Sequence, residues 1–328
     1  MRKTVRVLVV LLACGCTPRH GVKLKEISHF RTSGWAHDVS LDGDNVYVSD
    51  RQGGFSVFGR TRNYLRYRPP LEVRDVISLC PNSGNPLLAA RFEGLVLVKP
   101  SGEVADRYSN GDIANAVAVR GDFAFAAYGL EGLVVMHLGQ GRLQWAATLP
   151  TKGWSHDLRL TRSQALLADW DYGLRVVDIR DPQKPAEIGV LQGPATCISL
   201  AVKESGLRRM LALAQGHGGV LLADLDSEGR LSPLGRNSLG LDPKDPVHPD
   251  AGGWVHSVAW AGRYLFAANW KRGLALLDAG DPRNPRVLLE IPTSGTALGV
   301  KTEVQSDGSY LVFLAEGESG LRIFRFRA

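Results

Sequence analysis

The chain has 328 residues, of which 44% are hydrophobic and 22% charged, with a formal net charge of +6. This composition is that of a folded globular protein and excludes an intrinsically disordered chain. The 37 glycines have no three-residue period, which excludes collagen, and four cysteines are too few for a disulfide-stapled fold. The sequence has no basic stripe interleaved with aromatic residues, so we expect no nucleic-acid partner.

The N-terminus has the pattern of an export signal. Arg2, Lys3 and Arg6 precede a short apolar run over residues 7–13, which is too short to span a membrane. Cysteines follow directly, and this arrangement resembles a bacterial lipoprotein signal, in which cleavage before a cysteine leaves that residue to be acylated. The candidates for lipidation are Cys16 and Cys14.

This resemblance divides the chain into a signal peptide over residues 1–16, a short linker over 17–22 and a single domain over 23–328. The alternatives are an ordinary secretory signal and a buried first strand. Neither cysteine is followed by aspartate, so the resemblance implies the bacterial outer membrane, with the lipid anchor as the contact between protein and membrane.

One motif recurs along the rest of the chain: two strand-like runs, a step from glycine to a hydrophobic residue, and a third run. Each copy holds about four short runs rich in Val, Leu, Ala and Phe, without helical periodicity. Four strands in roughly 40 residues are typical of a β-propeller blade. The sequence therefore predicts an all-β, seven-bladed β-propeller. The glycines that mark the blades are Gly54, Gly94, Gly132, Gly173, Gly219, Gly273 and Gly320.

The last copy ends after its third run, at residues 324–326, so the seventh blade lacks an outer strand. The missing strand is present at the other end of the chain, because residues 23–31 (KLKEISHFR) resemble the outer runs KPAEIGVLQ and NPRVLLEIP. We expect this N-terminal strand to complete the last blade, which closes the ring and removes an open sheet edge.

Two copies carry a further motif. The segments VVDIRDPQKPAEIG and LLDAGDPRNPRVLLEI contain an Asp-Pro-x-x-Pro turn that begins at Asp181 and Asp281. They resemble the LVIVD repeat, which forms propellers in bacterial and archaeal surface proteins, whereas the other copies lack the turn. The resemblance implies a propeller at the cell surface and no particular chemistry.

Three copies begin with Gly-Trp-x-His, and each histidine lies 17 residues before its marker glycine. These are His37, His156 and His256, in the first, fourth and sixth blades. The tryptophans are Trp35, Trp154 and Trp254. In the remaining blades, the positions aligned with the histidines are Arg74, Asn115, Thr196 and Leu298.

Three interpretations of the histidines remain open. Three neutral imidazoles that converge on an axis suit a divalent transition metal with positions open to water. The histidines and tryptophans could instead contact another ligand. In the third, structural interpretation, each histidine bonds the backbone of a neighbouring blade and each tryptophan packs over the top of a blade.

A second set of residues comes just before the marker glycines, in loops that should return to the same end of the propeller. Aromatic side chains beside carboxylates and amides suit sugars, peptides or cationic groups, although aspartates also favour plain turns. We expect this set to surround the mouth of the channel. Its members are Asp50, Arg51, Tyr128, Asp169, Trp170, Asp171, Gln215, His217, Asn269, Trp270, Lys271 and Glu316.

The sequence contains no G-x-S-x-G, H-E-x-x-H, P-loop or C-x-x-C motif. We therefore expect a surface-anchored binding module, without an assigned cofactor. It should engage an envelope protein or a carbohydrate through its top face, the end of the propeller that carries the mouth of the channel. The alternative is a metal-dependent enzyme or metal-binding protein that uses His37, His156 and His256. A third possibility is a structural component of an envelope complex that binds through the sides of its blades.

Overall fold

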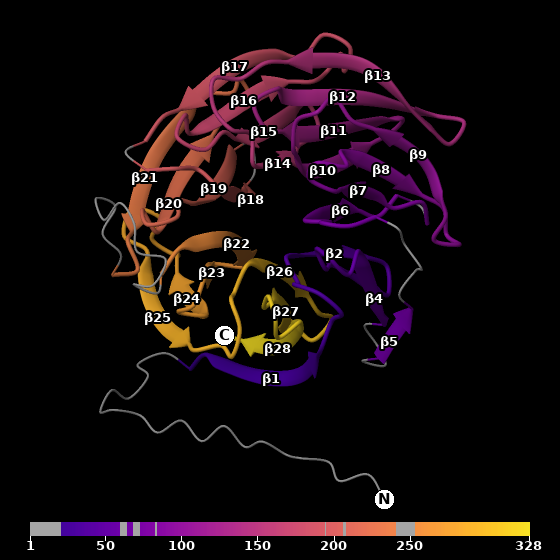
Figure 1. Ribbon diagram of the computed structural model, residues 1–328. Helices are drawn as coiled ribbons and strands as arrows, with labels where there is room; N and C mark the ends of the chain where they lie inside the picture. The colour runs from indigo at the N-terminus through magenta and orange to yellow at the C-terminus, as the bar shows by residue number, and fades with distance from the viewer. Residues whose placement is uncertain are drawn as a thin grey trace, which may run out of the picture.

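A computed structural model describes residues 21–59, 64–67, 73–82, 84–193, 195–205, 208–240 and 253–328, and only the backbone at 64–67 and 205. Throughout these ranges the regular secondary structure is β-strand. Seven antiparallel sheets of four strands each stand around a central axis (Figure 1). The all-β, seven-bladed propeller predicted from the glycine repeat is therefore confirmed.

The first three blades follow one another along the chain, and each begins with the strand nearest the axis (Figure 1). Blade 1 consists of β2 (Asp38–Asp42), β3 (Asn45–Ser49), β4 (Phe55–Gly59) and β5 (Tyr64–Tyr67). Blade 2 consists of β6 (Ser78–Cys80), β7 (Leu87–Ala89), β8 (Leu95–Val98) and β9 (Val104–Tyr108). Blade 3 consists of β10 (Ala114–Arg120), β11 (Phe123–Tyr128), β12 (Gly132–Gly139) and β13 (Arg142–Leu149).

The next three blades repeat this order. Blade 4 consists of β14 (Asp157–Leu160), β15 (Gln164–Ala168), β16 (Leu174–Asp178) and β17 (Ala186–Leu191). Blade 5 consists of β18 (Ser199–Ser205), β19 (Arg208–Ala214), β20 (Val220–Leu225) and β21 (Leu231–Asn237). Blade 6 consists of β22 (Val255–Ala261), β23 (Tyr264–Asn269), β24 (Leu274–Asp278) and β25 (Arg286–Ile291).

Blade 7 joins the two ends of the chain. It consists of β26 (Gly299–Val304), β27 (Tyr310–Ala315), β28 (Leu321–Arg327) and the N-terminal β1 (Lys23–Phe30). β1 pairs antiparallel with β28, from Lys23 opposite Arg327 to Phe30 opposite Leu321, with a bulge between Glu26 and Ser28. The predicted closure of the ring by the N-terminal strand is confirmed, and β28 has no open edge.

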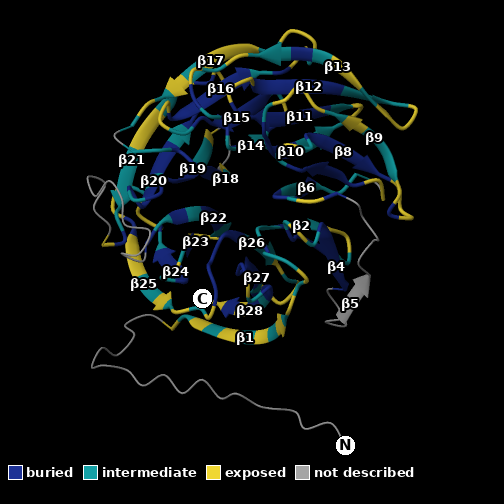
Figure 2. Cartoon of the chain, in the orientation of Figure 1, coloured by how far each residue is buried: buried dark blue, intermediate teal, exposed yellow. Residues whose placement is uncertain are grey.

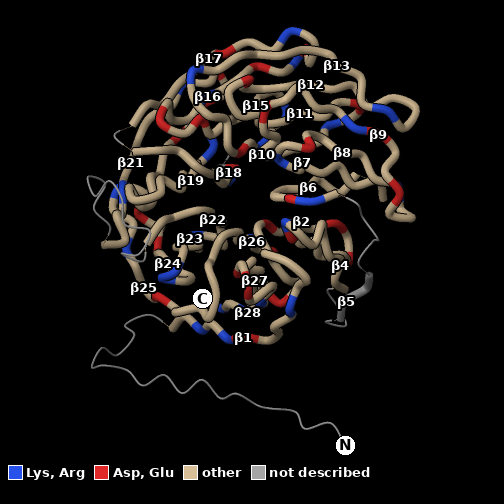
Figure 3. Tube along the Cα trace, viewed as in Figure 1, with Lys and Arg blue, Asp and Glu red and all other residues tan. Residues whose placement is uncertain are grey.

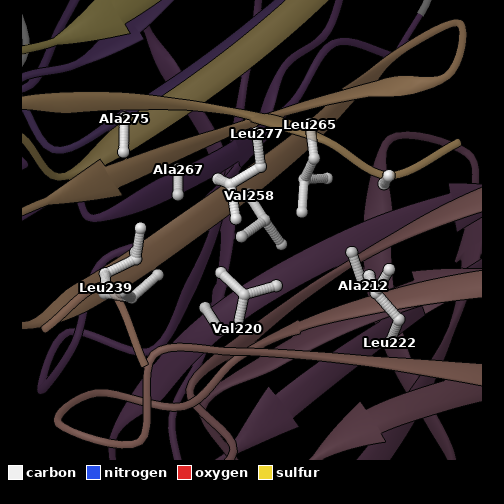
Figure 4. Close-up of a cluster of buried hydrophobic side chains, with 12 residues drawn as sticks. Ala212, Val220, Leu222, Leu239, Val258, Leu265, Ala267, Ala275 and Leu277 are labelled. Atoms are coloured by element: carbon white, nitrogen blue, oxygen red, sulfur yellow. The ribbon is translucent and has the colours of Figure 1, made fainter. Parts of the chain in front are cut away.

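Apolar side chains between neighbouring blades form the core. Between blades 5 and 6, Val220 and Leu222 pack in one cluster with Val258 and Leu265, and all four are at most 2% exposed (Figure 4). The inner strands of the disc are buried, whereas the outermost strands are exposed at many positions (Figure 2). A single blade would leave two apolar faces in water, so each blade is stabilised by burial against its neighbours.

The loop between the second and third strands of each blade reaches the beginning of the next blade's inner strand. In each described loop, one residue has a positive φ and forms an isolated β-bridge with that neighbouring blade. We call the face that carries these loops the top face. The bridged pairs are Arg51–Val76, Arg91–Ala114, Gly129–Ser155, Trp170–Cys197, Gly216–Val255, Trp270–Ala297 and Gly317–Ala36.

Candidate functional site

A pocket of about 490 Å³ opens on the top face over blades 1 to 4. This volume falls within the roughly 300–1,000 Å³ of typical small-ligand sites. Six of the predicted site residues line it, together with three others. The predicted six are His37, Arg51, Asn115, Trp154, His156 and Trp170, and the others are Ile77, Arg91 and Ile113.

Each of the three predicted histidines is bound to the backbone of the next blade. Nδ1 lies 2.9 Å from the Ile77 oxygen for His37, 3.0 Å from that of Ile198 for His156, and 3.1 Å from that of Leu298 for His256. Because a carbonyl oxygen can only accept, each Nδ1 carries the proton and donates it, which leaves the lone pair on Nε2. The structural interpretation of the histidines is therefore confirmed.

The three histidines also meet near the axis, although they come from blades 1, 4 and 6. The ring centroids of His37 and His256 are 5.2 Å apart, and those of His156 and His256 are 5.8 Å apart. The central cavity that all three line measures only about 40 Å³, which leaves room for a few water molecules at most. The histidines thus narrow the channel beneath the top-face pocket.

Burial keeps these imidazoles uncharged, although part of each residue is exposed to the channel. Burial is the main cause that lowers the pKa of His37 to about 3, and repulsion from His156 adds to it. Burial also lowers the pKa of His156, and it lowers the pKa of His256 well below its usual value. The rings therefore contribute no positive charge to the pocket at pH 7.

The residues do not fit the predicted transition-metal site. Among the side chains that the structure describes, no group of three His, Cys, Asp or Glu residues is arranged to hold a metal ion. His256 meets His37 and His156 edge to face, at interplanar angles of 87° and 75°. We therefore assign no metal chemistry to the three histidines.

Two positions that the sequence aligned with the histidines need correction. Each histidine directly follows the residue of its blade that forms the isolated β-bridge. By the same rule, the structural equivalents of the histidines are Ile77 in blade 2 and Ile198 in blade 5. The predicted alignment of Arg74 and Thr196 with the histidines is therefore wrong. Arg74 lies outside the pocket lining, and its backbone N–H donates to Glu93. The alignment of Asn115 and Leu298 is confirmed, and the Asn115 amide donates to the Ser155 oxygen of the next blade at 2.8 Å.

Several residues predicted at the mouth are instead buried beneath the loops. Each stands one residue before the positive-φ loop position, where its side chain turns back into the blade. For example, Asp169 accepts hydrogen bonds from the hydroxyls of Thr151 and Ser155 and pairs with Nε of Arg175 at 2.5 Å. These residues hold the loops rather than surround the mouth. The set is Asp50, Tyr128, Asp169, Gln215, Asn269 and Glu316, each at most 2% exposed.

The tryptophans of the three Gly-Trp-x-His copies have different positions. Trp154 lines the pocket. Trp254 and Trp35 pack instead against the loop of the preceding blade, because a Cβ added to Gly216 or Gly317 would lie 3.0 Å from the respective indole ring. The structural interpretation, with tryptophans packed over the blade tops, is thus confirmed for two of the three.

The remaining predicted residues lie away from the pocket lining. His217 packs edge to face on Trp254, with ring centroids 4.6 Å apart. Trp270 is part-buried, and its indole N–H has no partner among the described residues. Asp171 and Lys271 are exposed on the loops of blades 4 and 6.

Arg91 is the charged lining residue that sequence reasoning missed. It precedes the marker glycine Gly94 by three residues, as Arg51 precedes Gly54. The same comparison of loops that identified Arg51 therefore contained the signal for Arg91. Its backbone is bridged to Ala114, which carries the side chain from blade 2 toward blade 3.

The lipidation candidates Cys14 and Cys16 lie outside the described residues. In the part of the chain that the structure describes, no helix is long and apolar enough to cross a membrane.

The chain matches the model of the LVIVD repeat at residues 33–58, 111–136, 157–192 and 252–293, which fall in blades 1, 3, 4 and 6. Two of these copies lack the Asp-Pro-x-x-Pro turn on which the resemblance was based. No curated protein matches the sequence.

Among solved structures, several propellers share the fold. The WD40 domain of Doa1 covers 92% of this chain and 97% of its own, at 12% identity and a TM-score of 0.66. The Myceliophteria thermophila Cps50 (Swd1) propeller covers 93% and 100%, at 13% identity and a TM-score of 0.69. U3-55K covers 94% and 98%, at 14% identity and a TM-score of 0.68. The chain is therefore a closed seven-bladed β-propeller that carries matches to the LVIVD repeat in four of its blades.

Proposed function

We propose that the protein is a binding module, anchored by lipid at the bacterial outer membrane, that engages a protein or carbohydrate partner through its top face. The pocket of about 490 Å³ over blades 1 to 4 carries this proposal. Trp154 and Trp170 offer aromatic surface for stacking, and Arg51 and Arg91 offer charged hydrogen-bond donors.

The scaffold supports this role because the pocket walls are held in place before any partner arrives. The Arg91 N–H donates to the Ala114 oxygen at 3.2 Å, and the Trp170 N–H donates to the Cys197 oxygen at 3.1 Å. These two lining residues are thereby tied to the next blade. A preformed site loses little conformational entropy when it binds, which favours affinity.

The test compares two tryptophans. Trp154 lines the pocket, whereas Trp145 is 60% exposed on the outer strand β13. A chain that begins at residue 17 retains every described strand and can be screened against a random peptide library and a glycan array. We expect binders that Trp154→Ala loses and Trp145→Ala keeps. Binding that both variants retain, or that only Trp145→Ala loses, would contradict the proposal.

The anchor is proposed from the basic start, the short apolar run and the two cysteines of the N-terminus. Growth with labelled palmitate tests it on the full chain, with Cys14→Ala and Cys16→Ala made separately. We expect label in the outer-membrane fraction that one of the two variants loses. A wild-type chain without label would contradict a lipid anchor and would leave the top-face proposal intact.

A further inference from the structure

Two arginines at the pocket share one carboxylate. Nε of Arg51 lies 2.9 Å from Asp75, and a terminal nitrogen of Arg91 lies 3.7 Å from the other oxygen of the same side chain. All three residues are about one third exposed. Two guanidinium groups against one carboxylate leave an excess positive charge, and both arginines retain donors for a further acceptor.

The other charges near the pocket do not cancel this excess. Arg51 and Arg91 are the only charged side chains among the pocket-lining residues that the structure describes. Asp50 accepts from the backbone N–H groups of Ser33 and Gly34, away from the pocket lining. Over the whole disc the two signs are interspersed, so the excess is local (Figure 3).

Carboxylates also occur on the loops around the pocket, but they lie on its rim rather than in its lining. Glu93 is bound to Arg107 at 2.6 Å. Glu131 and Asp171 are exposed on the loops of blades 3 and 4. A negatively charged group inside the pocket would therefore find arginines as the charged residues of its lining.

Large apolar side chains are exposed on the loops of the same blades that form the pocket. Phe92 and Leu130 are each 65% exposed and Tyr172 is 40% exposed, on the top-face loops of blades 2, 3 and 4. The Arg91 guanidinium lies 5.3 Å from the centre of the Phe92 ring, which links this apolar rim to the charged pocket. Exposed apolar groups around a polar centre are typical of protein-binding surfaces.

We infer that the top face binds a protein segment that places a carboxylate side chain against the remaining donors of Arg51 and Arg91 and packs neighbouring apolar side chains on Phe92, Leu130 and Tyr172. This inference rests on the proposed function and names its partner class. The charge excess selects an acidic group, and the apolar rim favours a polypeptide over a carbohydrate, which would bring hydroxyls to these side chains.

A display library of random linear peptides, selected on the chain that begins at residue 17, tests the inference. We expect enriched peptides to contain Asp or Glu beside apolar residues. For the tightest peptide, its Glu→Gln or Asp→Asn analogue should bind about tenfold to a hundredfold more weakly, because a hydrogen bond to a charged group is lost. Arg91→Gln and Arg51→Gln should weaken the acidic peptide similarly and leave the neutral analogue unchanged.

The matched control is Arg208→Gln, because Arg208 is also paired with an aspartate, Asp224, but is the first residue of β19 and does not line the pocket. It should not change the affinity. Thermal melting of each variant shows whether the fold is intact, and a Phe92→Ala variant provides a second readout that alters no charge. It should weaken the acidic peptide and its neutral analogue alike.

The possible outcomes distinguish failure of the acidic-segment inference from failure of the proposed binding function. Enriched peptides that need Trp154 but lack acidic residues, or that bind Arg51→Gln and Arg91→Gln as well as wild type, overturn the inference and leave the binding function standing. A glycan signal that needs Trp154, without peptide enrichment, also overturns the inference alone. If neither library gives a signal that depends on Trp154, the proposed function fails as well.

Discussion

Nδ1 of His37 donates a hydrogen bond to the backbone oxygen of Ile77, at 2.9 Å, and Ile77 occupies the position of His37 in the next blade. The same relationship joins His156 to Ile198 and His256 to Leu298. In each case a histidine donates to the backbone of the next blade, where the residue at the same position is apolar. These bonds lock neighbouring blades together at the channel, where outer-strand packing cannot reach.

The neutral histidines predict a dependence of stability on pH. The unfolded chain protonates its imidazoles below about pH 6.5, whereas the folded pKa of His37 is lowered to about 3. Protonation of the unfolded chain therefore leaves the free energy of unfolding unchanged above about pH 6.5 and lowers it progressively as the pH falls toward 3. We expect each buried histidine to account for a loss of at most about 2 kcal/mol at pH 5.

Urea unfolding at neutral and mildly acidic pH measures this dependence. A His37→Gln variant keeps a donor for the Ile77 oxygen but does not titrate, so the stability that it loses between the two pH values should be smaller. An identical acid-induced loss in wild type and variant would show that His37 is not held neutral.

The ion pair beneath the loop of blade 4 should contribute strongly to stability. Arg175 is 6% exposed in its side chain and pairs with the fully buried Asp169 and with Glu187. Arg175→Met leaves Asp169 buried without its counterion, which costs about 3–5 kcal/mol. Denaturant unfolding checks this, and the control Arg180→Met, at an exposed pair with Asp178, should have little effect. Equal effects would contradict the assigned role of the buried pair.

Ring closure predicts what happens when the N-terminal strand is removed. A chain that begins at residue 32 lacks β1 and exposes the edge of β28, together with apolar residues such as Phe324 and Phe326. An open, apolar edge pairs with other chains. By light scattering after gel filtration, we expect oligomers or aggregates, whereas a chain that begins at residue 21 stays monomeric. A monomer with unchanged stability would show that β1 does not close the ring.

The packing of Trp254 on Gly216 can be tested with two glycines of similar backbone conformation. Gly216 has φ of +54° and a Cβ there would lie 3.0 Å from the indole, whereas Gly43 has φ of +52° with nothing within 4 Å. Both alanine variants incur the same backbone strain. Overpacking adds about 1–3 kcal/mol at Gly216→Ala alone, so thermal melting should show a larger loss there. Equal losses would mean that Trp254 moves freely.

The fold was predictable because blades 2 to 7 each require a glycine at the same position, where the backbone of the outer strand leaves no room for a Cβ. A Cβ on Gly173 would overlap the Leu191 oxygen at the end of blade 4's outer strand, and a Cβ on Gly320 would overlap the Phe30 oxygen in the same way. The glycine spacing therefore reports the blades directly. The second overlap also explains why residues 23–31 resemble an outer strand, since Phe30 occupies that place in blade 7.

The site was less predictable, because spacing along the chain does not show how a loop turns. The positive φ of Trp170 directs Trp170 to the pocket and Asp169 into the blade, although the two residues are adjacent. Nothing in their identities separates these roles. Arg74 was aligned with the histidines for a related reason, since the two residues between it and Ile77 cannot be assigned to loop or strand without the bridge from Arg51 to Val76.

The most direct test of the top-face account is photo-crosslinking in the cells that express the full chain. A photoreactive benzoylphenylalanine replaces Phe92 on the rim of the pocket in one variant and Trp145 on the outer strand β13 in the other, and mass spectrometry maps the crosslinked peptide. We predict that the Phe92 position captures a defined protein segment that contains an acidic residue beside apolar ones, and that Arg91→Gln abolishes this product. Capture from the Trp145 position alone, or capture at Phe92 that Arg91→Gln leaves unchanged, would contradict the account.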